Sequence, residues 1–227
     1  MLKIASDQPT LLPWAGFFQK ALSVDILIYS IGVPVSYGAK DHYHNRVKLA
    51  GSWLTLPLQG PTDGVPFKDV RFDPAGLVKI GKSLRTVFGK RFPHRDRAQW
   101  IIDLVEGWKG ENLLADLNEH LIREMKRQLG VVSYYTTRDE VIPDQEQSKT
   151  ERLIARIRRV TEGKCEYYMG RGALQYIDAK LMNKAGIKVF LQTFAEGIRD
   201  ETAVHLIACE DDPKAAIAAL GRWEELT

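Results

Sequence analysis

The chain has 227 residues, of which 44% are hydrophobic and 27% charged, so it is long enough to bury one sizeable core. Its net charge of +3 and isoelectric point near 8.8 permit a polyanionic partner without requiring one. The longest apolar stretch, residues 26–39, contains Gly32 and Pro34 and is too short to cross a bilayer, and the first residues carry no secretory leader. We therefore expect a cytoplasmic protein with no membrane partner, and its two distant cysteines, Cys165 and Cys209, are expected to be reduced thiols.

The order of predicted elements indicates the fold class. Short β-rich segments predict strands at 2–5, 26–30, 53–58, 131–135, 166–169, 188–191 and 204–208. Apolar periodicity predicts helices at 113–129 and 153–160, and shorter helices are expected at 75–88, 97–108, 173–185 and 213–221. Strands that alternate with helices predict an α/β fold with a largely parallel or mixed sheet flanked by helices. We expect one domain over residues 1–227, and the sequence leaves open a small helical basic subdomain at about 75–130.

The segment QPTLLPWAGFFQK at residues 8–20 is the most informative part of the chain. Pro9 and Pro13 fix φ and lack a backbone donor, so neither is expected inside a helix or a central strand. Pro13 is suited to open a helix, and the strand at 2–5 should end in a polar loop at 6–8 just before it. Ligands bind at this place in open α/β sheets, although a stiff surface connection explains the pattern equally well.

Residues 37–48 bring together groups suited to proton transfer and anion binding. His42 and His44 alternate at strand spacing and would share a face, and imidazole moves protons near neutral pH. Arg46 is suited to bidentate contacts with phosphate or carboxylate. No third ligand stands at a recognisable metal-site spacing, and a polar edge strand with solvated histidines is the alternative.

A strand is predicted to run into Gly170-Arg171-Gly172 and then into a helix. Glycines allow close approach of backbone to a ligand, and a helix N-terminus favours anions, so phosphate, pyrophosphate or carboxylate would fit. The pattern is neither a Walker loop nor a complete dinucleotide fingerprint. A tight turn without a ligand is the commoner explanation.

Basic residues interleaved with aromatic ones follow between residues 79 and 100. Such interleaving is typical of surfaces that bind nucleic acid or another polyphosphate, and a solvated charged face is the alternative. The set comprises Lys79, Lys82, Arg85, Lys90, Arg91, His94, Arg95 and Arg97, with Phe88, Phe92 and Trp100 between them.

Taken together, these segments resemble the WbqC-like protein family. The family pattern Gln-Pro-x-(Tyr/Phe)-Leu-Pro-Trp-x-Gly-(Tyr/Phe)-Phe resembles residues 8–18, and its Asn-Arg and Trp-Leu-Thr-Val-Pro region resembles residues 45–57. The family's Lys-x-x-Arg-Leu helix and Tyr-Leu-Ser-Gly-x-Gly turn are similar to residues 149–153 and 168–178. An acidic Asp-Asp-Val-Gln segment of the family is replaced here by residues 30–34, so an ion or substrate held there in relatives would need other groups, such as Asp41 or the histidines.

The resemblance implies group transfer. Bacterial relatives belong to polysaccharide biosynthesis, and similar proteins take part in phage thymidine hypermodification, in which an amino acid displaces pyrophosphate from an activated base. We therefore hypothesise a transferase that joins a glycine-like amino acid to a pyrophosphorylated 5-hydroxymethyl pyrimidine in bacteriophage DNA, in the host cytoplasm. Its partners would be that DNA and the free amino acid. Aminoacyl or acyl transfer to a sugar of a surface polysaccharide (O-antigen), and a non-catalytic nucleic-acid-binding accessory protein, are the alternatives.

On this hypothesis, individual side chains receive roles. His42 or His44 would act as the general base and Asp41 would orient it. Arg46, Arg171 and the backbone N–H groups near Gly170 and Gly172 would hold the departing pyrophosphate. The other predicted substrate contacts are Gln8, Trp14, Asn45 and Tyr176.

The predicted DNA contacts come from the basic segment. The backbone would be bound by Lys82, Arg85, Lys90, Arg91 and Arg95, and Phe92 or Trp14 would stack on a flipped base. No cofactor follows from the sequence with certainty, and a divalent ion such as Mg²⁺ is left open.

Overall fold

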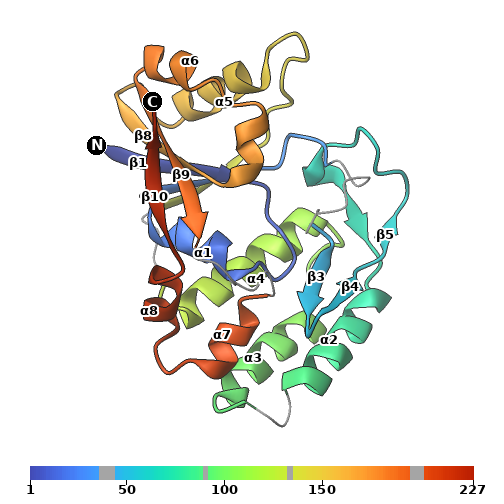
Figure 1. Cartoon of the computed structure of the whole chain (residues 1–227). Coiled ribbons are helices and arrows are strands. Elements are labelled where there is room, and N and C mark those ends of the chain that lie inside the picture. The colour runs from blue at the N-terminus through green and yellow to red at the C-terminus, as the bar shows by residue number, and fades with distance from the viewer. Residues whose placement is uncertain (36–43, 89–91, 132–134, 195–201) are drawn as a thin grey trace.

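A six-stranded sheet forms the centre of the computed structural model, which describes residues 1–35, 44–88, 92–131, 135–194 and 202–227 (Figure 1). Its strand order is β10-β9-β8-β1-β2-β7. In that order the strands are Gly221–Leu226, Ile187–Phe194, Cys165–Met169, Leu2–Asp7, Ile26–Ser30 and Tyr135–Asp139. All neighbours are parallel except β10, which runs antiparallel to β9. The predicted α/β fold with a mixed sheet is confirmed.

The strand order reverses beside β1. The chain adds β2 and then β7 on one side of β1, and afterwards places β8 and β9 on the other side. The register pairs Ile4 with Ile26 on β2 and with Tyr167 on β8. In open α/β sheets, ligands bind in the crevice outside the carboxyl ends of the strands at such a reversal. The fold therefore predicts a ligand site at the carboxyl ends of β1 and β8.

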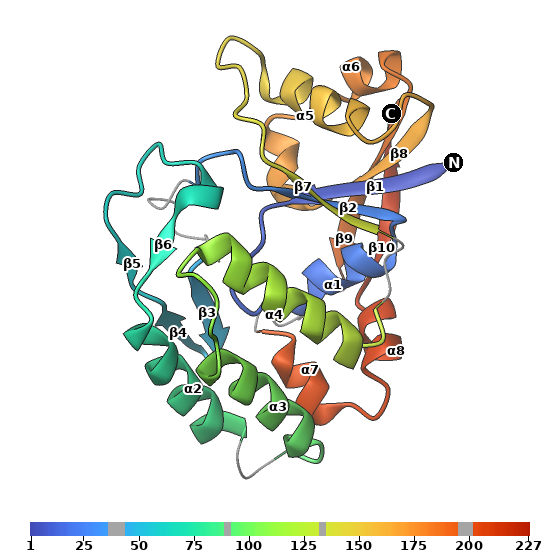
Figure 2. The ribbon, with the colours of Figure 1, turned by 180° about the vertical axis from the view of Figure 1, so that it is seen from behind.

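Helices cover both faces of the sheet (Figures 1 and 2). The helices α5 (Lys149–Arg158) and α6 (Ala179–Lys184) pack on one face, in a buried cluster that includes strand residues Ile4 and Val189. The helices α1 (Ala15–Leu22) and α4 (Leu114–Gln128) cover the other face. Because side chains alternate along a strand, neighbouring residues at the end of β1 point to opposite faces of the sheet.

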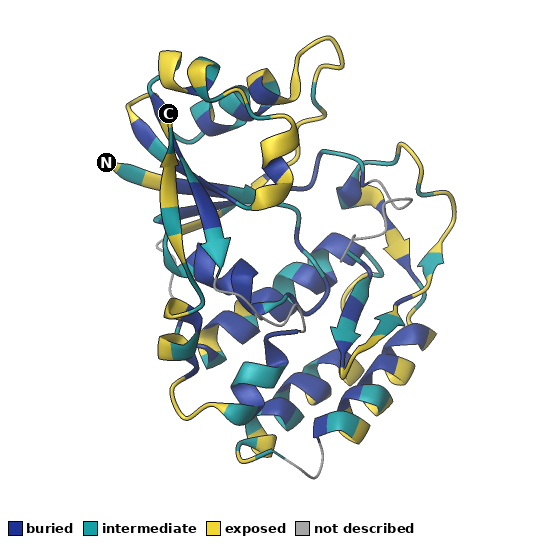
Figure 3. Ribbon diagram, viewed as in Figure 1, coloured by how far each residue is buried: buried dark blue, intermediate teal, exposed yellow. Residues whose placement is uncertain are grey.

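A second group of elements extends from α4, away from α5 and α6 (Figure 1). Its helices are α2 (Ala75–Phe88), α3 (Arg95–Glu106), α7 (Val204–Cys209) and α8 (Pro213–Ala218). Its strands are β3 (Arg46–Leu49), β4 (Ser52–Thr55), β5 (Leu58–Gln59) and β6 (Arg71–Phe72), and the 3₁₀ turn η1 covers Phe67–Asp69. These elements contribute to the same cluster of buried side chains as α1, α4 and one face of the sheet (Figure 3). In the parts of the chain that are described, no helix is long and apolar enough to span a membrane.

The predicted strand 26–30 and the predicted helix 75–88 are confirmed residue for residue. The predicted strand 204–208 is wrong, because this segment is helix α7, whose buried residues Val204, Ile207 and Ala208 recur at helical spacing. The polar loop expected at 6–8 begins later, since β1 continues to Asp7. Two predicted helices are also shorter than expected: the last ends at Ala218, before β10, and the segment 173–185 divides into two short helices.

Candidate functional site

A cavity of about 950 Å³ opens at the carboxyl edge of the sheet, where the strand order reverses. Its walls come from the end of β1 and the loop after it, from α1, from α5, and from the 3₁₀ turn η2 (Arg171–Gln175) that follows β8. This volume lies in the range of sites that enclose nucleotide-sized ligands, about 300–1,000 Å³. The position and the size together mark it as the candidate functional site.

Basic side chains dominate the charge of this cavity. Lys149, Arg152 and Arg156 lie three and seven residues apart on α5, so they share one face of the helix. Lys20 on α1 and Arg171 on η2 add two more cations, and Asp7 is the one carboxylate among the described residues of the wall. Such a surplus of positive charge favours a ligand with several negative charges.

The N-terminus of α5 is fixed by a reciprocal capping box. The Ser148 hydroxyl accepts a hydrogen bond from the Glu151 backbone N–H at 3.2 Å, and the Glu151 carboxylate accepts one from the Ser148 N–H at 2.7 Å. The hydrogen bonds of the Ser148 side chain and backbone to the Glu151 carboxylate lower its pKa. The cap therefore determines where the helix begins, and with it the direction in which Lys149 and Arg152 project.

The same helix holds the loop after η2. Thr150 Oγ1 donates to the carbonyl oxygen of Tyr176 at 2.7 Å and accepts from the Asp178 N–H at 3.1 Å. The Lys149 ammonium lies 5.3 Å from the centroid of the Tyr176 ring. Tyr176 and the cations of α5 consequently form one continuous wall.

Replacing Ser148 by alanine should remove half of this cap. We expect Ser148→Ala to lower the free energy of unfolding by about 1 kcal/mol, because the Glu151 N–H loses its acceptor. Chemical denaturation measures the change, and Ser52→Ala on exposed β4 is the matched control, with an expected change below about 0.5 kcal/mol. Equal stability of Ser148→Ala and the unaltered chain would contradict the role of the cap.

The end of β1 joins both helical layers at the floor of the cavity. Asp7 forms an ion pair with Lys20 of α1, a residue that is 7% exposed. Ser6, the preceding residue, shares a hydrogen bond of 2.6 Å with Ser30 of β2 and accepts one of 3.3 Å from Arg156 of α5. Asp7 therefore faces one layer and Ser6 the other, as the alternation along a strand requires.

Two tyrosines of the cavity remain protonated at neutral pH. Burial, followed by the charge of nearby groups that include Asp7, raises the pKa of Tyr167 and of Tyr176. A raised pKa keeps each hydroxyl in its neutral form. Both tyrosines can therefore donate hydrogen bonds to a ligand, and neither is suited to accept a proton as a general base.

Trp14 provides an aromatic wall, and Gly16 makes room for it. The Trp14 ring lies 5.0 Å from the ring of Phe194, measured between centroids. A Cβ atom at Gly16 would overlap the indole of Trp14. The position of the Trp14 ring therefore requires a residue without a side chain at position 16.

We expect Gly16→Ala to displace the indole ring. Overpacking of this kind costs about 1–3 kcal/mol, and the helix preference of alanine over glycine offsets about 1 kcal/mol of it. Thermal denaturation and the tryptophan emission maximum report the change. Gly163→Ala is the control, because a Cβ there meets nothing closer than 3.9 Å and its φ is not in the left-handed region. An unchanged emission maximum in Gly16→Ala would contradict this account of Trp14.

The structure brings most of the predicted substrate and catalytic residues to this one cavity. Those that line it are Gln8, Trp14, His44, Gly170, Arg171, Gly172 and Tyr176. The Gln8 side-chain amide donates to the Val33 carbonyl at 2.9 Å, so it also ties the loop after β1 to the loop after β2. The predicted residues Asp41 and His42 lie outside the described parts of the chain.

Two predicted residues are placed elsewhere. Asn45 is buried, and its side-chain amide donates to the Leu56 carbonyl at 2.8 Å. The Arg46 guanidinium lies over the ring of Trp53, 4.2 Å from its centroid, on the β3–β4 hairpin. Neither residue lines the cavity, so the structure gives them roles in the hairpin in place of the predicted substrate contacts.

The predicted nucleic-acid contacts do not line the cavity either. Lys82 and Arg85 belong to α2 and Arg95 to α3, at the end of the molecule opposite α5 (Figure 1). Arg85 pairs with Glu106 at 2.5 Å. Phe92 is partly buried and packs against the core, at ring-centroid distances of 5.1 Å from Phe88 and 5.4 Å from His205. Lys90 and Arg91 lie outside the described residues.

Sequence reasoning missed the cations that dominate the cavity, namely Lys20, Lys149, Arg152 and Arg156. The spacing of three and seven residues on α5 was the signal available for the last three. The anion site expected at the N-terminus of a helix 173–185 must be corrected, because only the five-residue turn η2 follows Gly170. Within the described ranges, no three His, Cys, Asp or Glu side chains cluster as metal ligands.

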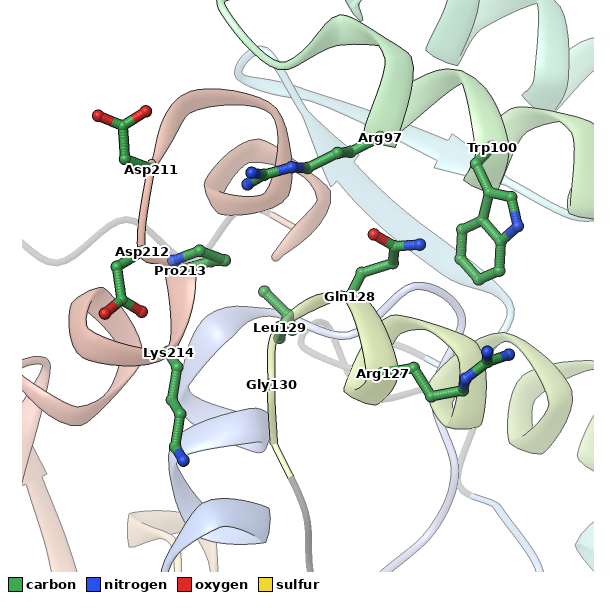
Figure 4. Close-up of a pocket in the computed structure, with 10 residues that line it drawn as sticks. All are labelled: Arg97, Trp100, Arg127, Gln128, Leu129, Gly130, Asp211, Asp212, Pro213 and Lys214. Atoms are coloured by element: carbon green, nitrogen blue, oxygen red, sulfur yellow. The ribbon is translucent and has the colours of Figure 1, made fainter.

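A second hollow, of about 570 Å³, lies between α3, the end of α4 and the turn before α8 (Figure 4). Two of its cations are held within the chain, since Arg97 donates to the Glu210 carbonyl at 3.1 Å and Arg127 pairs with Glu124 at 2.7 Å, and Lys214 also lines it. None of its lining residues belongs to the sheet. We therefore place the functional site in the larger cavity.

The model of the WbqC-like protein family matches residues 8–198 of the chain. No curated protein and no solved structure matches the chain. The matched span contains every described residue of the cavity wall except Ser6 and Asp7, so the family match and the cavity concern the same part of the molecule.

Proposed function

Because the chain belongs to the WbqC-like protein family, we propose that it is a transferase that joins a glycine-like amino acid to a pyrophosphorylated 5-hydroxymethyl pyrimidine in phage DNA. The observation that carries this proposal is a cavity with five cations beside an aromatic wall, at the point of strand reversal. A pyrophosphate requires several cations, and a pyrimidine ring requires a flat apolar surface such as Trp14.

The proposed reaction is a displacement at carbon. The amine nitrogen forms a bond to the methylene carbon on the pyrimidine ring, the bond from that carbon to the pyrophosphate oxygen breaks, and the nitrogen loses one proton. His44, which lines the cavity, accepts this proton. Asp7 binds the ammonium group of the incoming amino acid, and His44 removes the proton before the attack, because only the neutral amine has the lone pair that forms the new bond.

The cations of the cavity act on the leaving group. Negative charge accumulates on the pyrophosphate as its bond to carbon breaks. Arg152, Arg156 and Arg171 stabilise that charge in the transition state, where fixed positive groups have their largest effect on rate. Tyr167 and Tyr176, which remain protonated, donate hydrogen bonds to the same oxygens or to the pyrimidine edge.

A second candidate is transfer of an amino acid or acyl group to a sugar activated by a nucleoside diphosphate. One observation favours it. Lys82 and Arg85, the described basic residues of α2 assigned to DNA, lie at the end of the molecule opposite α5, whereas the cavity is large enough for a nucleotide sugar. Both candidates place phosphate groups in the cavity, but they differ in the acceptor and in the bond that breaks. In the second, the nucleoside diphosphate stays on the sugar and the leaving group departs from the activated acyl donor.

Mass spectrometry of nucleosides distinguishes them. DNA with pyrophosphorylated 5-hydroxymethyluracil is incubated with the protein and mixed amino acids, then digested. The proposal expects a nucleoside heavier by one amino-acid residue, formed with release of pyrophosphate and absent with the His44→Gln variant. If the folded protein leaves the DNA unmodified but forms a modified product from a nucleotide sugar, the second candidate is correct and the proposal is wrong.

A further inference from the structure

Asp139, at the carboxyl end of β7, is a buried carboxylate that binds Arg156 of α5 and Arg159, the residue that caps the C-terminus of that helix. Its side chain is 5% exposed. Arg156 Nε donates to it at 2.7 Å, and Arg159 donates through Nη2 at 2.8 Å and through Nε at 3.1 Å. These bonds, against the opposing effect of burial, hold the pKa of Asp139 below its usual value. Asp139 itself is not part of the cavity wall.

Arg156 connects this carboxylate to the cavity. Its side chain is 13% exposed and lines the wall, and its Nη1 donates to Ser6 Oγ at 3.3 Å. A guanidinium has five N–H donors, and the bonds to Asp139 and Ser6 use two of them. The planar group is therefore held from two sides while donors remain for an anion in the cavity.

We infer that Asp139 is a positioning residue, which orients the Arg156 guanidinium so that it binds the anionic group of the substrate. The inference rests on the proposed function in taking pyrophosphate as that group. Arg159 donates to both oxygens of the carboxylate and lies outside the cavity. A network that spans β7, α5 and β1 thus controls one side chain of the site.

Charge alone leads to the opposite expectation, which makes the inference testable. Asp139→Asn removes a negative charge near an anion site, so a purely electrostatic effect would strengthen anion binding. An amide has one acceptor oxygen, and its NH₂ group would face one of the two guanidinium groups. Loss of orientation would instead weaken anion binding.

Calorimetric titration of the full chain with inorganic pyrophosphate at fixed ionic strength decides between these results. We expect at least a tenfold weaker affinity for Asp139→Asn and for Arg156→Ala. The double variant should be no weaker than Arg156→Ala, because Asp139 acts through that side chain. Glu140→Gln makes the same change of charge at the neighbouring, half-exposed residue and should bind pyrophosphate at least as well as the unaltered chain.

Circular dichroism and thermal unfolding verify that each variant is folded. If Asp139→Asn does not fold, Asp139→Glu decides instead, since it keeps the charge but moves the carboxylate by one methylene and should also weaken binding. Unchanged or tighter binding by the folded variant, or an undiminished effect of Asp139→Asn in the Arg156→Ala background, would overturn the inference alone. Failure of the unaltered chain to bind pyrophosphate would overturn the proposed function, and the inference with it.

Discussion

Replacement of Arg171 by alanine should lower kcat/KM for the pyrophosphorylated substrate by about 100- to 1,000-fold, the usual effect of removing one group that stabilises charge in a transition state. The free energy of unfolding should change by no more than about 0.5 kcal/mol. Arg171 is exposed at the wall of the cavity, so its removal leaves no buried group without a partner. We therefore expect Arg171→Ala to lower activity and to leave stability nearly unchanged.

Arg222→Ala is the matched control, since Arg222 is 81% exposed on β10 and lies outside the cavity. It removes the same charge from the chain and should leave kcat/KM within about twofold, on the grounds that charges beyond a Debye length of about 8–10 Å are screened. Rates of pyrophosphate release and denaturation curves for both variants provide the comparison. Equal losses of activity in the two variants, or a loss of stability that parallels the loss of activity in Arg171→Ala, would refute the assignment.

The strands and helices with a clear apolar pattern could be predicted from the sequence. β2 is fully buried and reads as a short apolar run, and α2 carries its buried residues at helical spacing. α7 was mistaken for a strand because its β-branched and apolar residues occupy only six positions, too few for a periodicity to decide. The strand β10 was missed because its exposed residues outnumber the apolar ones and its pairing with β9 stabilises it.

The candidate site could be predicted where a motif lies at the end of a parallel strand. Gln8 follows β1 and Gly170 follows β8, and the carboxyl ends of neighbouring parallel strands meet at one edge. The pairs Asp7–Lys20 and Asp139–Arg156 could not be predicted, because each depends on how a helix is placed on the sheet. Spacing along the chain carries no information on such contacts.

Asn118 of α4 lies outside both sequence motifs but contacts each of them. It is fully buried, and its Nδ2 donates to the carbonyl oxygens of Pro9 at 3.1 Å and of His44 at 2.8 Å. Those two residues belong to the two segments that the sequence marked as most informative. One side-chain amide therefore joins the loop after β1 to the segment that carries the proposed base.

Asn118→Asp should destabilise the protein by about 3–5 kcal/mol at neutral pH, the usual cost of a buried charge without a partner. Both donors are lost, and the new carboxylate oxygen faces two carbonyl oxygens. Burial would raise the folded-state pKa of the introduced carboxyl above its unfolded value of about 3.9. Its protonated form can donate one hydrogen bond, so the deficit relative to the unaltered chain should be smallest below about pH 4 and should grow as pH rises through the folded pKa.

Denaturation curves between pH 4 and pH 8 measure this deficit, with Asn183→Asp as the control on the exposed surface of α6. The control makes the same chemical change where water solvates the carboxylate, so we expect less than about 0.5 kcal/mol at any pH. A deficit in Asn118→Asp that equals that of the control would contradict the bridging role. A large deficit that does not shrink toward pH 4 would show that the lost amide donors, and not the buried charge, are responsible. A deficit well above that of the control supports the conclusion that one buried amide holds the His44 segment against the loop after β1, and its pH dependence measures the share that comes from the buried charge.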